Sequence, residues 1–228
     1  MEPVVINESG LSLEEIGQLR SMGFEVAEQG SDEWLEERLG KATASRFIDV
    51  VDHGVSGTKP KAGYYNYMNE LVAERLTGKA KRFSSKPMDW GKSHEAEAAA
   101  IYEDMTGFEL FECGLYLIPD MAAGASPDRL VGDDGLLEVK CPNSTTHIDY
   151  VLNGAPDKYI AQMQGQMWAT GRKWCDFMSY DPEMPENLRV YIERIERDDD
   201  YIKTMNDRVV AFLALVDERE AYLRERME

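Results

Sequence analysis

SPDRLVGDDGLLEVKCP (residues 126–142) contains two short apolar runs on either side of Gly-Asp-Asp-Gly (132–135). Gly and Asp at this spacing are typical of a β-hairpin turn. We therefore expect two adjacent antiparallel strands, with Asp128 on or beside the first and Glu138 on the second. Side chains alternate along a strand, so Glu138 and Lys140 share one face and the apolar residues between them point to the other.

Helical and strand patterns continue on both sides of this hairpin. The 228 residues suffice for one domain with a substantial core, and we expect a single domain over 1–228. The pattern predicts an α/β (α+β) fold with a central mixed β-sheet flanked by helices. We expect helices at 12–22, from Ser31, from near Thr43, at 64–78, 90–107 and 156–170 and from about Asp198 to 228, and strands within 108–119, 122–132, 135–142, 173–181 and 188–196.

Asp128, Glu138 and Lys140 suit phosphodiester cleavage, which needs a hard divalent cation held by oxygen ligands and an activated water. Asp128 is expected to bridge two metal ions, and Glu138 with the carbonyl of Val139 to bind one of them. Lys140 is expected to orient the attacking water or help to deprotonate it. Glu95, on the alanine-rich helix just before the sheet, is a candidate third carboxylate.

The bare pattern also has a structural interpretation. Acid-x-Lys triplets are common on strand surfaces, where they form exposed ion pairs, and a helix glutamate is commonly solvated. Lys140 is followed by Cys-Pro, which ends the strand at the rim of the sheet, where functional sites gather.

The formal net charge of −18 argues against a nucleic-acid partner when taken alone. The charge is uneven, because residues 38–92 carry 11 Lys/Arg against 5 Asp/Glu, whereas both flanking segments are strongly acidic. The densest part, 78–92, includes Lys79, Lys81 and Arg82. This stretch is either a polyanion-binding groove or a solvated basic loop.

Several motifs in fixed order together closely resemble the lambda-type phage recombination exonucleases (alkaline exonucleases), a branch of the PD-(D/E)xK nuclease superfamily. The motifs are QGSDEWLEERLGKATAS (29–45), WGKSHE (90–95), SPD-x9-EVKCP (126–142), YIAQMQGQMW (159–168) and YDP (180–182). The resemblance runs from about Gln29 to near Arg197. Residues 1–28 form an extension with no specific match.

The resemblance implies a magnesium-dependent enzyme with two ions, for which manganese can substitute. It implies processive degradation of the 5′-ended strand of linear double-stranded DNA, leaving a 3′ overhang for phage or prophage recombination. It also implies a ring-shaped homotrimer that works with a single-strand annealing protein.

Residue by residue, the resemblance extends the candidate site. Asp128, Glu138 and Lys140 match the reaction core, Glu95 a carboxylate near the metals and Gln162 a glutamine at the reacting region. Arg38, Thr43 and Ser45 match a pocket for the 5′-phosphate. Met88 falls where the family places an apolar side chain that separates the terminal base pair, although leucine is the usual residue there.

Each assignment has an alternative. Arg38 is otherwise a surface ion-pair partner of a nearby acid, and Thr43 a helix cap. Gln162 and Gln166 share a helix face, which alone indicates solvated surface. The four tryptophans, Trp34, Trp90, Trp168 and Trp174, are expected in the core. The three histidines have no ligand spacing, so no metal is assigned to them.

Two other functions stay open: an end-independent endonuclease of the same superfamily, and a nuclease-like DNA-binding module without catalysis. A purely structural acidic protein accounts for the charge but not for the ordered motifs. Three scattered cysteines, no membrane-length apolar run and no secretory signal favour a reduced, cytoplasmic compartment without a membrane partner. The cysteines do not favour a zinc site.

Overall fold

The computed structural model describes residues 27–52, 60–80 and 86–226, and the side chains of 86–89 and Lys92 lie outside the description. The helices are α2 (Asp32–Arg38), η1 (Ala44–Arg46), α3 (Phe47–Val51), α4 (Ala62–Thr77), α5 (Lys86–Thr106), α6 (Ser144–Asn153), α7 (Asp157–Thr170), η2 (Glu186–Leu188) and α8 (Asp199–Arg224). The strands are β1 (Ala42–Thr43), β2 (Leu110–Phe111), β3 (Tyr116–Leu117), β4 (Ala123–Ala125), β5 (Arg129–Val131), β6 (Gly135–Lys140), β7 (Trp174–Tyr180) and β8 (Val190–Glu196).

The strands form two mixed sheets instead of the single central sheet that we expected. The smaller has the order β1-β4-β3 and the larger β2-β5-β6-β7-β8. The predicted hairpin is confirmed, since β5 and β6 pair antiparallel with Arg129 opposite Leu137. Next to it, β6 pairs parallel with β7, and Glu138 lies opposite Phe177. The mixed α+β fold class is therefore confirmed.

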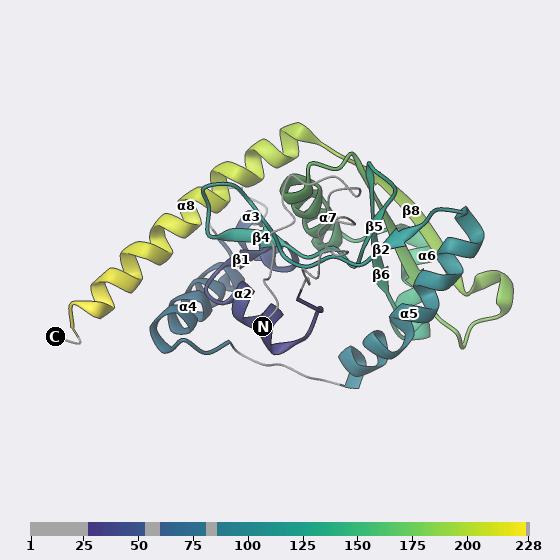
Figure 1. The fold of residues 1–228 in the computed structure, drawn as a ribbon, viewed down its shortest axis with the longest axis horizontal. Coiled ribbons are helices and arrows are strands. Elements are labelled where there is room, and N and C mark those ends of the chain that lie inside the picture. Colours follow the sequence, from purple (N-terminus) through teal and green to yellow (C-terminus); the bar gives the residue numbers. More distant parts are fainter. Residues whose placement is uncertain (1–26, 53–59, 81–85, 227–228) are drawn as a thin grey trace, which may run out of the picture.

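The larger sheet lies between α7 and α5 (Figure 1). Alternation along β6 explains this layering. Leu136 belongs to the apolar cluster that contains residues of α7, whereas Leu137 and Val139 pack in a second cluster with Ala98 of α5. Because Glu138 and Lys140 share the side of Leu136, both point toward α7.

Local signals place most of the helix ends. The Ser31 hydroxyl caps α2 by accepting a hydrogen bond from the Trp34 N–H. Gly78 ends α4 in the left-handed conformation, and the Asp198 side chain caps α8. The helix expected at 12–22 lies outside the described residues.

A helix begins near Thr43, as expected, because Thr43 is the N-cap of η1 and α3 follows directly. The Thr43 side chain makes no capping hydrogen bond, and the residue also ends the parallel bridge to β4. One local expectation was wrong. Trp90 is not a core residue, because 37% of it is exposed.

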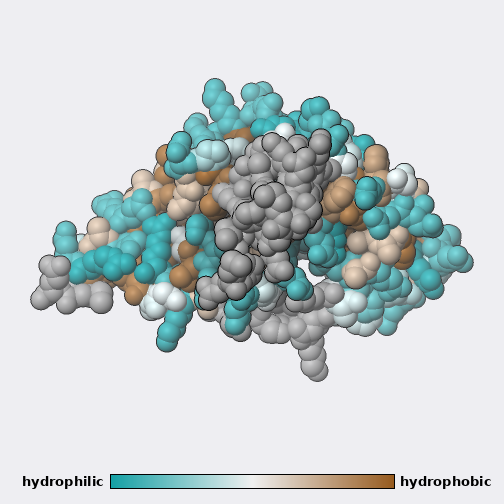
Figure 2. All heavy atoms as spheres, in the orientation of Figure 1, coloured by the Kyte–Doolittle hydropathy of each residue, from teal (hydrophilic) through white to brown (hydrophobic). Residues whose placement is uncertain are grey.

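Hydrophilic side chains cover much of the described surface in Figure 2, with hydrophobic ones in smaller areas between them. Among the described residues, no helix is long and apolar enough to cross a membrane.

Candidate active site

A buried arginine, Arg172, holds the turn of the β5–β6 hairpin. Arg172 donates to three backbone carbonyls, those of Val131 at 3.3 Å, Gly132 at 2.6 Å and Gly135 at 2.8 Å. These carbonyls lie at the end of β5, in the turn and at the start of β6. Arg172 therefore fixes the turn that sets Asp128 relative to Glu138.

Glu138 is completely buried, and both of its carboxylate oxygens accept hydrogen bonds. Gln162 Nε2 donates to Oε1 at 2.7 Å, and Gln166 Nε2 donates to Oε2 at 2.6 Å. The two glutamines are one turn apart on α7, so they reach the carboxylate from one helix face. The Lys140 ammonium also donates to Oε1. These donors satisfy a buried charge that would otherwise be costly.

Asp128 directly precedes β5 and accepts a hydrogen bond from the Val139 N–H at 2.7 Å. Burial and the negative charge of Glu138 raise its pKa well above the ordinary value. Burial acts to lower the pKa of Lys140, but Glu138 and Asp128 outweigh it and raise that pKa above the ordinary value. Lys140 is therefore a fixed cation between two acids, suited to orienting a water more than to accepting its proton.

Glu95 approaches the same rim from α5. It forms an ion pair with Arg129 at 3.2 Å, and its charge contributes to the raised pKa of Asp128. In the part of the chain that the structure describes, no group of three or more His, Cys, Asp or Glu side chains converges as a metal-binding cluster. The donors present nevertheless fit a hard divalent cation, because the buried Glu138 and the half-buried Asp128 are neighbouring oxygen ligands whose mutual repulsion a cation would relieve.

Arg38 forms a second group of polar contacts, at the end of α2. Its guanidinium donates to Thr43 Oγ1 at 3.2 Å and Ser126 Oγ at 3.4 Å, and it stacks on Trp34 with 4.0 Å to the ring centroid. Burial lowers the pKa of Arg38 to about 10. Among the described residues, no carboxylate forms an ion pair with Arg38, so the surface ion-pair alternative finds no support in this part of the chain. A partly desolvated guanidinium that meets hydroxyl groups suits an anionic ligand.

Ser126 connects this pocket to the carboxylates. Its hydroxyl accepts from Trp34 Nε1 at 3.0 Å and from Arg38, and it lies two residues before Asp128. Ser45 joins through its hydroxyl, 3.5 Å from that of Thr43. The structure thus brings together Arg38, Thr43 and Ser45, the three residues expected to bind the phosphate.

Sequence reasoning missed the roles of two residues here. Ser126 is the first residue of the SPD motif, and its hydroxyl was a visible signal. Gln166 shares the helix face of Gln162, but that pairing was interpreted as solvated surface, whereas Gln166 is fully buried against Glu138.

The basic stretch is only partly described. Lys79 follows α4 and is exposed, whereas Lys81 and Arg82 lie outside the described residues. Met88 belongs to α5, but its side chain is among those not described.

The chain is similar to known proteins in both sequence and fold. Residues 33–173 match the family model of the YqaJ-like viral recombinase domain. The fold matches an alkaline exonuclease, LHK-Exo from Laribacter hongkongensis, with TM-score 0.80 and 44% identity over 86% of this chain and 98% of that one. A structure of LHK-Exo in complex with dAMP matches with the same TM-score and coverage at 45% identity.

A phage-related exonuclease from Haemophilus somnus 129PT shares the fold, with TM-score 0.69 and 17% identity over 82% of this chain and 96% of that one. No curated protein matches the chain.

Proposed function

Because the chain belongs to the YqaJ-like viral recombinase family, we propose that this DNA exonuclease is magnesium-dependent and degrades the 5′-ended strand of linear duplex DNA. The product is a duplex with a 3′ single-stranded overhang, ready for recombination by strand annealing. The contact between Arg38 and Ser126, two residues before Asp128, carries the proposal, since an anion bound by Arg38 would lie near the carboxylates.

The pocket accounts for the strand that is degraded. The guanidinium of Arg38 offers several donors to a terminal phosphate, and the hydroxyls of Thr43, Ser45 and Ser126 add to them. A 5′-phosphate held there aligns the first scissile bond with the carboxylates, and such positioning can lower a barrier substantially. Each cleavage leaves a new 5′-phosphate, which favours processive digestion.

Asp128, Glu138, Glu95 and the carbonyl of Val139 would hold two Mg²⁺ ions, and Mn²⁺ would serve in their place. When bound, the ions supply Lewis acidity and lower the pKa of the attacking water. Gln162 and Gln166 fix the direction of the Glu138 carboxylate. Lys140 orients the water and adds positive charge next to the phosphate in the transition state.

The remaining parts of the proposal rest on the family resemblance. They are the action of Lys79, Lys81 and Arg82 on the DNA backbone, the separation of the terminal base pair by Met88, a ring-shaped homotrimer and a single-strand annealing partner.

The first prediction tests the pocket with duplexes that carry a 5′-phosphate or a 5′-hydroxyl. Wild type should start faster on the phosphorylated end. Arg38→Ala should lose most of that preference, and Arg38→Lys should recover only part of it because a point charge lacks the guanidinium fork. The measurement is the ratio of initial rates on the two ends.

Arg194→Lys is the matched control, because Arg194 also stacks on a tryptophan, Trp174, at 3.6 Å but lies on β8. It should keep the wild-type ratio. If Arg38→Ala also keeps that ratio, the phosphate pocket is misplaced. Digestion of covalently closed circular DNA would support the endonuclease alternative, and absence of magnesium-dependent nucleotide release would support a silent binding module.

A further inference from the structure

The short link between α2 and β1 turns at Gly40, two residues after Arg38 and three before Thr43. Gly40 is buried and has φ +66°, a left-handed conformation that favours glycine. A Cβ atom here would lie 2.5 Å from Cγ of Arg75. The Lys41 N–H bonds back to the Arg38 carbonyl at 3.0 Å, so the link is a tight turn.

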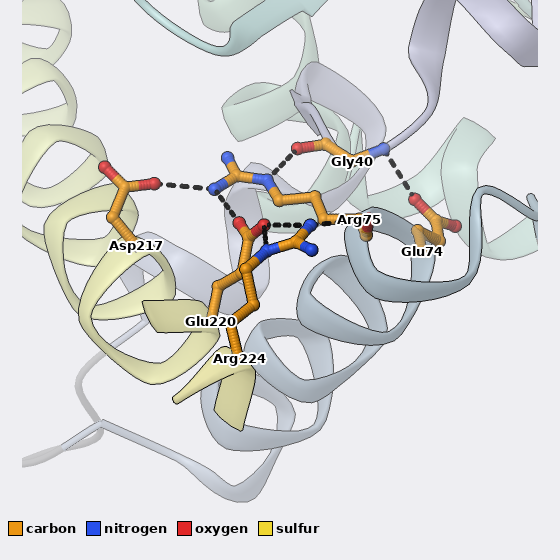
Figure 3. A network of polar contacts seen from close by, with 6 residues as sticks. All are labelled: Gly40, Glu74, Arg75, Asp217, Glu220 and Arg224. Atoms are coloured by element: carbon orange, nitrogen blue, oxygen red, sulfur yellow. Dashed lines mark hydrogen bonds and ion pairs between the residues drawn. The ribbon is translucent and has the colours of Figure 1, made fainter. Parts of the chain in front are cut away.

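Two adjacent residues of α4 hold both backbone polar groups of Gly40 (Figure 3). The Gly40 N–H donates to Glu74 Oε2 at 2.9 Å. Its carbonyl accepts from Arg75 Nε at 2.8 Å. The two peptide groups on either side of the Gly40 Cα atom are therefore held in place by α4, from outside the proposed phosphate pocket.

Arg75 is in turn held by acids from the last turns of α8 (Figure 3). Its Nη1 lies 2.6 Å from Asp217 Oδ1 and 3.4 Å from Glu220 Oε2. Glu220 Oε1 accepts from Arg224 at 2.9 Å through Nε and at 2.7 Å through Nη2. The side chains of Arg75 and Glu220 are 16% and 19% exposed, so solvent screens their contact less than that of a surface pair, whereas Asp217 is 68% exposed.

We propose that Arg75 is a positioning residue for the 5′-phosphate pocket, and this rests on the function proposed above. Its guanidinium spans α8 and the Gly40 carbonyl, which fixes the turn that separates Arg38 from Thr43. Those two side chains meet at 3.2 Å across the turn, so a shift of Gly40 changes the shape of the pocket.

A merely structural role for Arg75 would lower stability without changing substrate preference. The test therefore uses Arg75→Lys, which keeps a positive charge near Asp217 and Glu220. A lysine has one nitrogen, and it cannot reach the acids and the Gly40 carbonyl together. Arg219→Ala is the matched control, because Arg219 also joins α8 to α4, through Asn69, without contacting Gly40.

Initial rates on 5′-phosphate and 5′-hydroxyl duplexes are compared at equal folded fractions. We expect Arg75→Lys to reduce the phosphate preference about tenfold or more, since misplacement by about 1 Å can cost about a hundredfold. The loss should appear mainly on the phosphorylated end. Glu220→Gln, a milder change to the same network, should shift the ratio in the same direction, and Arg219→Ala should keep the wild-type ratio.

The outcomes separate the two proposals. If wild type shows no preference for the phosphate, the proposed function fails and the role of Arg75 fails with it. If wild type shows the preference and Arg75→Lys retains it, only the role of Arg75 is overturned. An equal loss in Arg219→Ala would also overturn it, because general loosening of α8 would then be the cause.

Discussion

At the scale of single residues, Asp128 combines catalytic potential with a cost to the metal-free fold. Its carboxyl group is half-buried beside Glu138, and the loss of solvent and the charge of Glu138 both raise its pKa. Folding therefore makes this group bind its proton more tightly. It follows that the metal-free protein loses stability as pH rises from the ordinary pKa through the raised one.

We therefore predict that Asp128→Asn abolishes hydrolysis but raises the melting temperature of the protein in EDTA at pH 8. The amide can still accept from the Val139 N–H, and it carries no charge. The gain should be a few degrees, at about 2–4 °C per kcal/mol for a chain of this size, and it should narrow toward pH 4.

Calorimetry across that pH range measures the effect. Asp134→Asn, at an exposed acid in the turn of the same hairpin, is the control and should show no such trend. A lower melting temperature for Asp128→Asn at pH 8 would contradict the cost assigned to the buried charge.

At the scale of elements, the β5–β6 hairpin depends on Arg172 as well as on its own turn. Removal of this side chain leaves three carbonyls without their donor. We expect Arg172→Ala to lower the free energy of unfolding by about 3 kcal/mol, because hydrogen bonds to a buried charged group are worth about 1.5–3 kcal/mol each and are not additive.

Urea unfolding measures this loss. Lys173→Ala removes the neighbouring pair between Lys173 and Asp134, which spans 2.9 Å with both side chains more than half exposed. That control should cost at most about 1 kcal/mol. Equal costs for the two variants would show that the Arg172 contacts do not hold the hairpin.

Elements with a strong local signal were predictable, and those without one were not. The Gly-Asp-Asp-Gly turn and the caps at Ser31 and Gly78 act within a few residues, so they were visible in the sequence. Helix α6 was not assigned, although Asn143 caps it by accepting from the Thr146 N–H at 2.9 Å. Its buried residues are His147 and Tyr150, whereas its aliphatic residues Ile148, Val151 and Leu152 are exposed, so no aliphatic stripe indicated a buried helix face.

The candidate site was likewise predictable only where the signal in the sequence is local. Glu138 and Lys140 share a strand face, which periodicity alone predicts. The contact between Arg38 and Ser126 joins residues 88 positions apart, so no local pattern contains it. Burial of Gln166 follows from the placement of α7 on the larger sheet, which likewise depends on tertiary packing.

At the scale of the whole molecule, the net charge of −18 and a DNA substrate are compatible only if the basic residues are concentrated. They are, in residues 38–92, which contain Arg38 and end just before Glu95. The acidic remainder would repel DNA from the other surfaces and favour one approach to the site.

We therefore expect binding of a DNA end to weaken steeply with salt in spite of the net charge, because the local contacts are made with phosphates. Replacement of Lys79, Lys81 and Arg82 by glutamine should lower the slope of log K against log salt by about 2–3, at about 0.9 per phosphate contact. The measurement is a titration of a fluorescent duplex in calcium at several salt concentrations.

The control replaces three exposed residues outside the basic segment, Lys173, Lys203 and Arg226. It changes the total charge equally and should leave the slope unchanged. Equal slopes for both triple variants and wild type would identify the basic stretch as a solvated loop, and would leave Arg38 and the metals as the features that attract the DNA end.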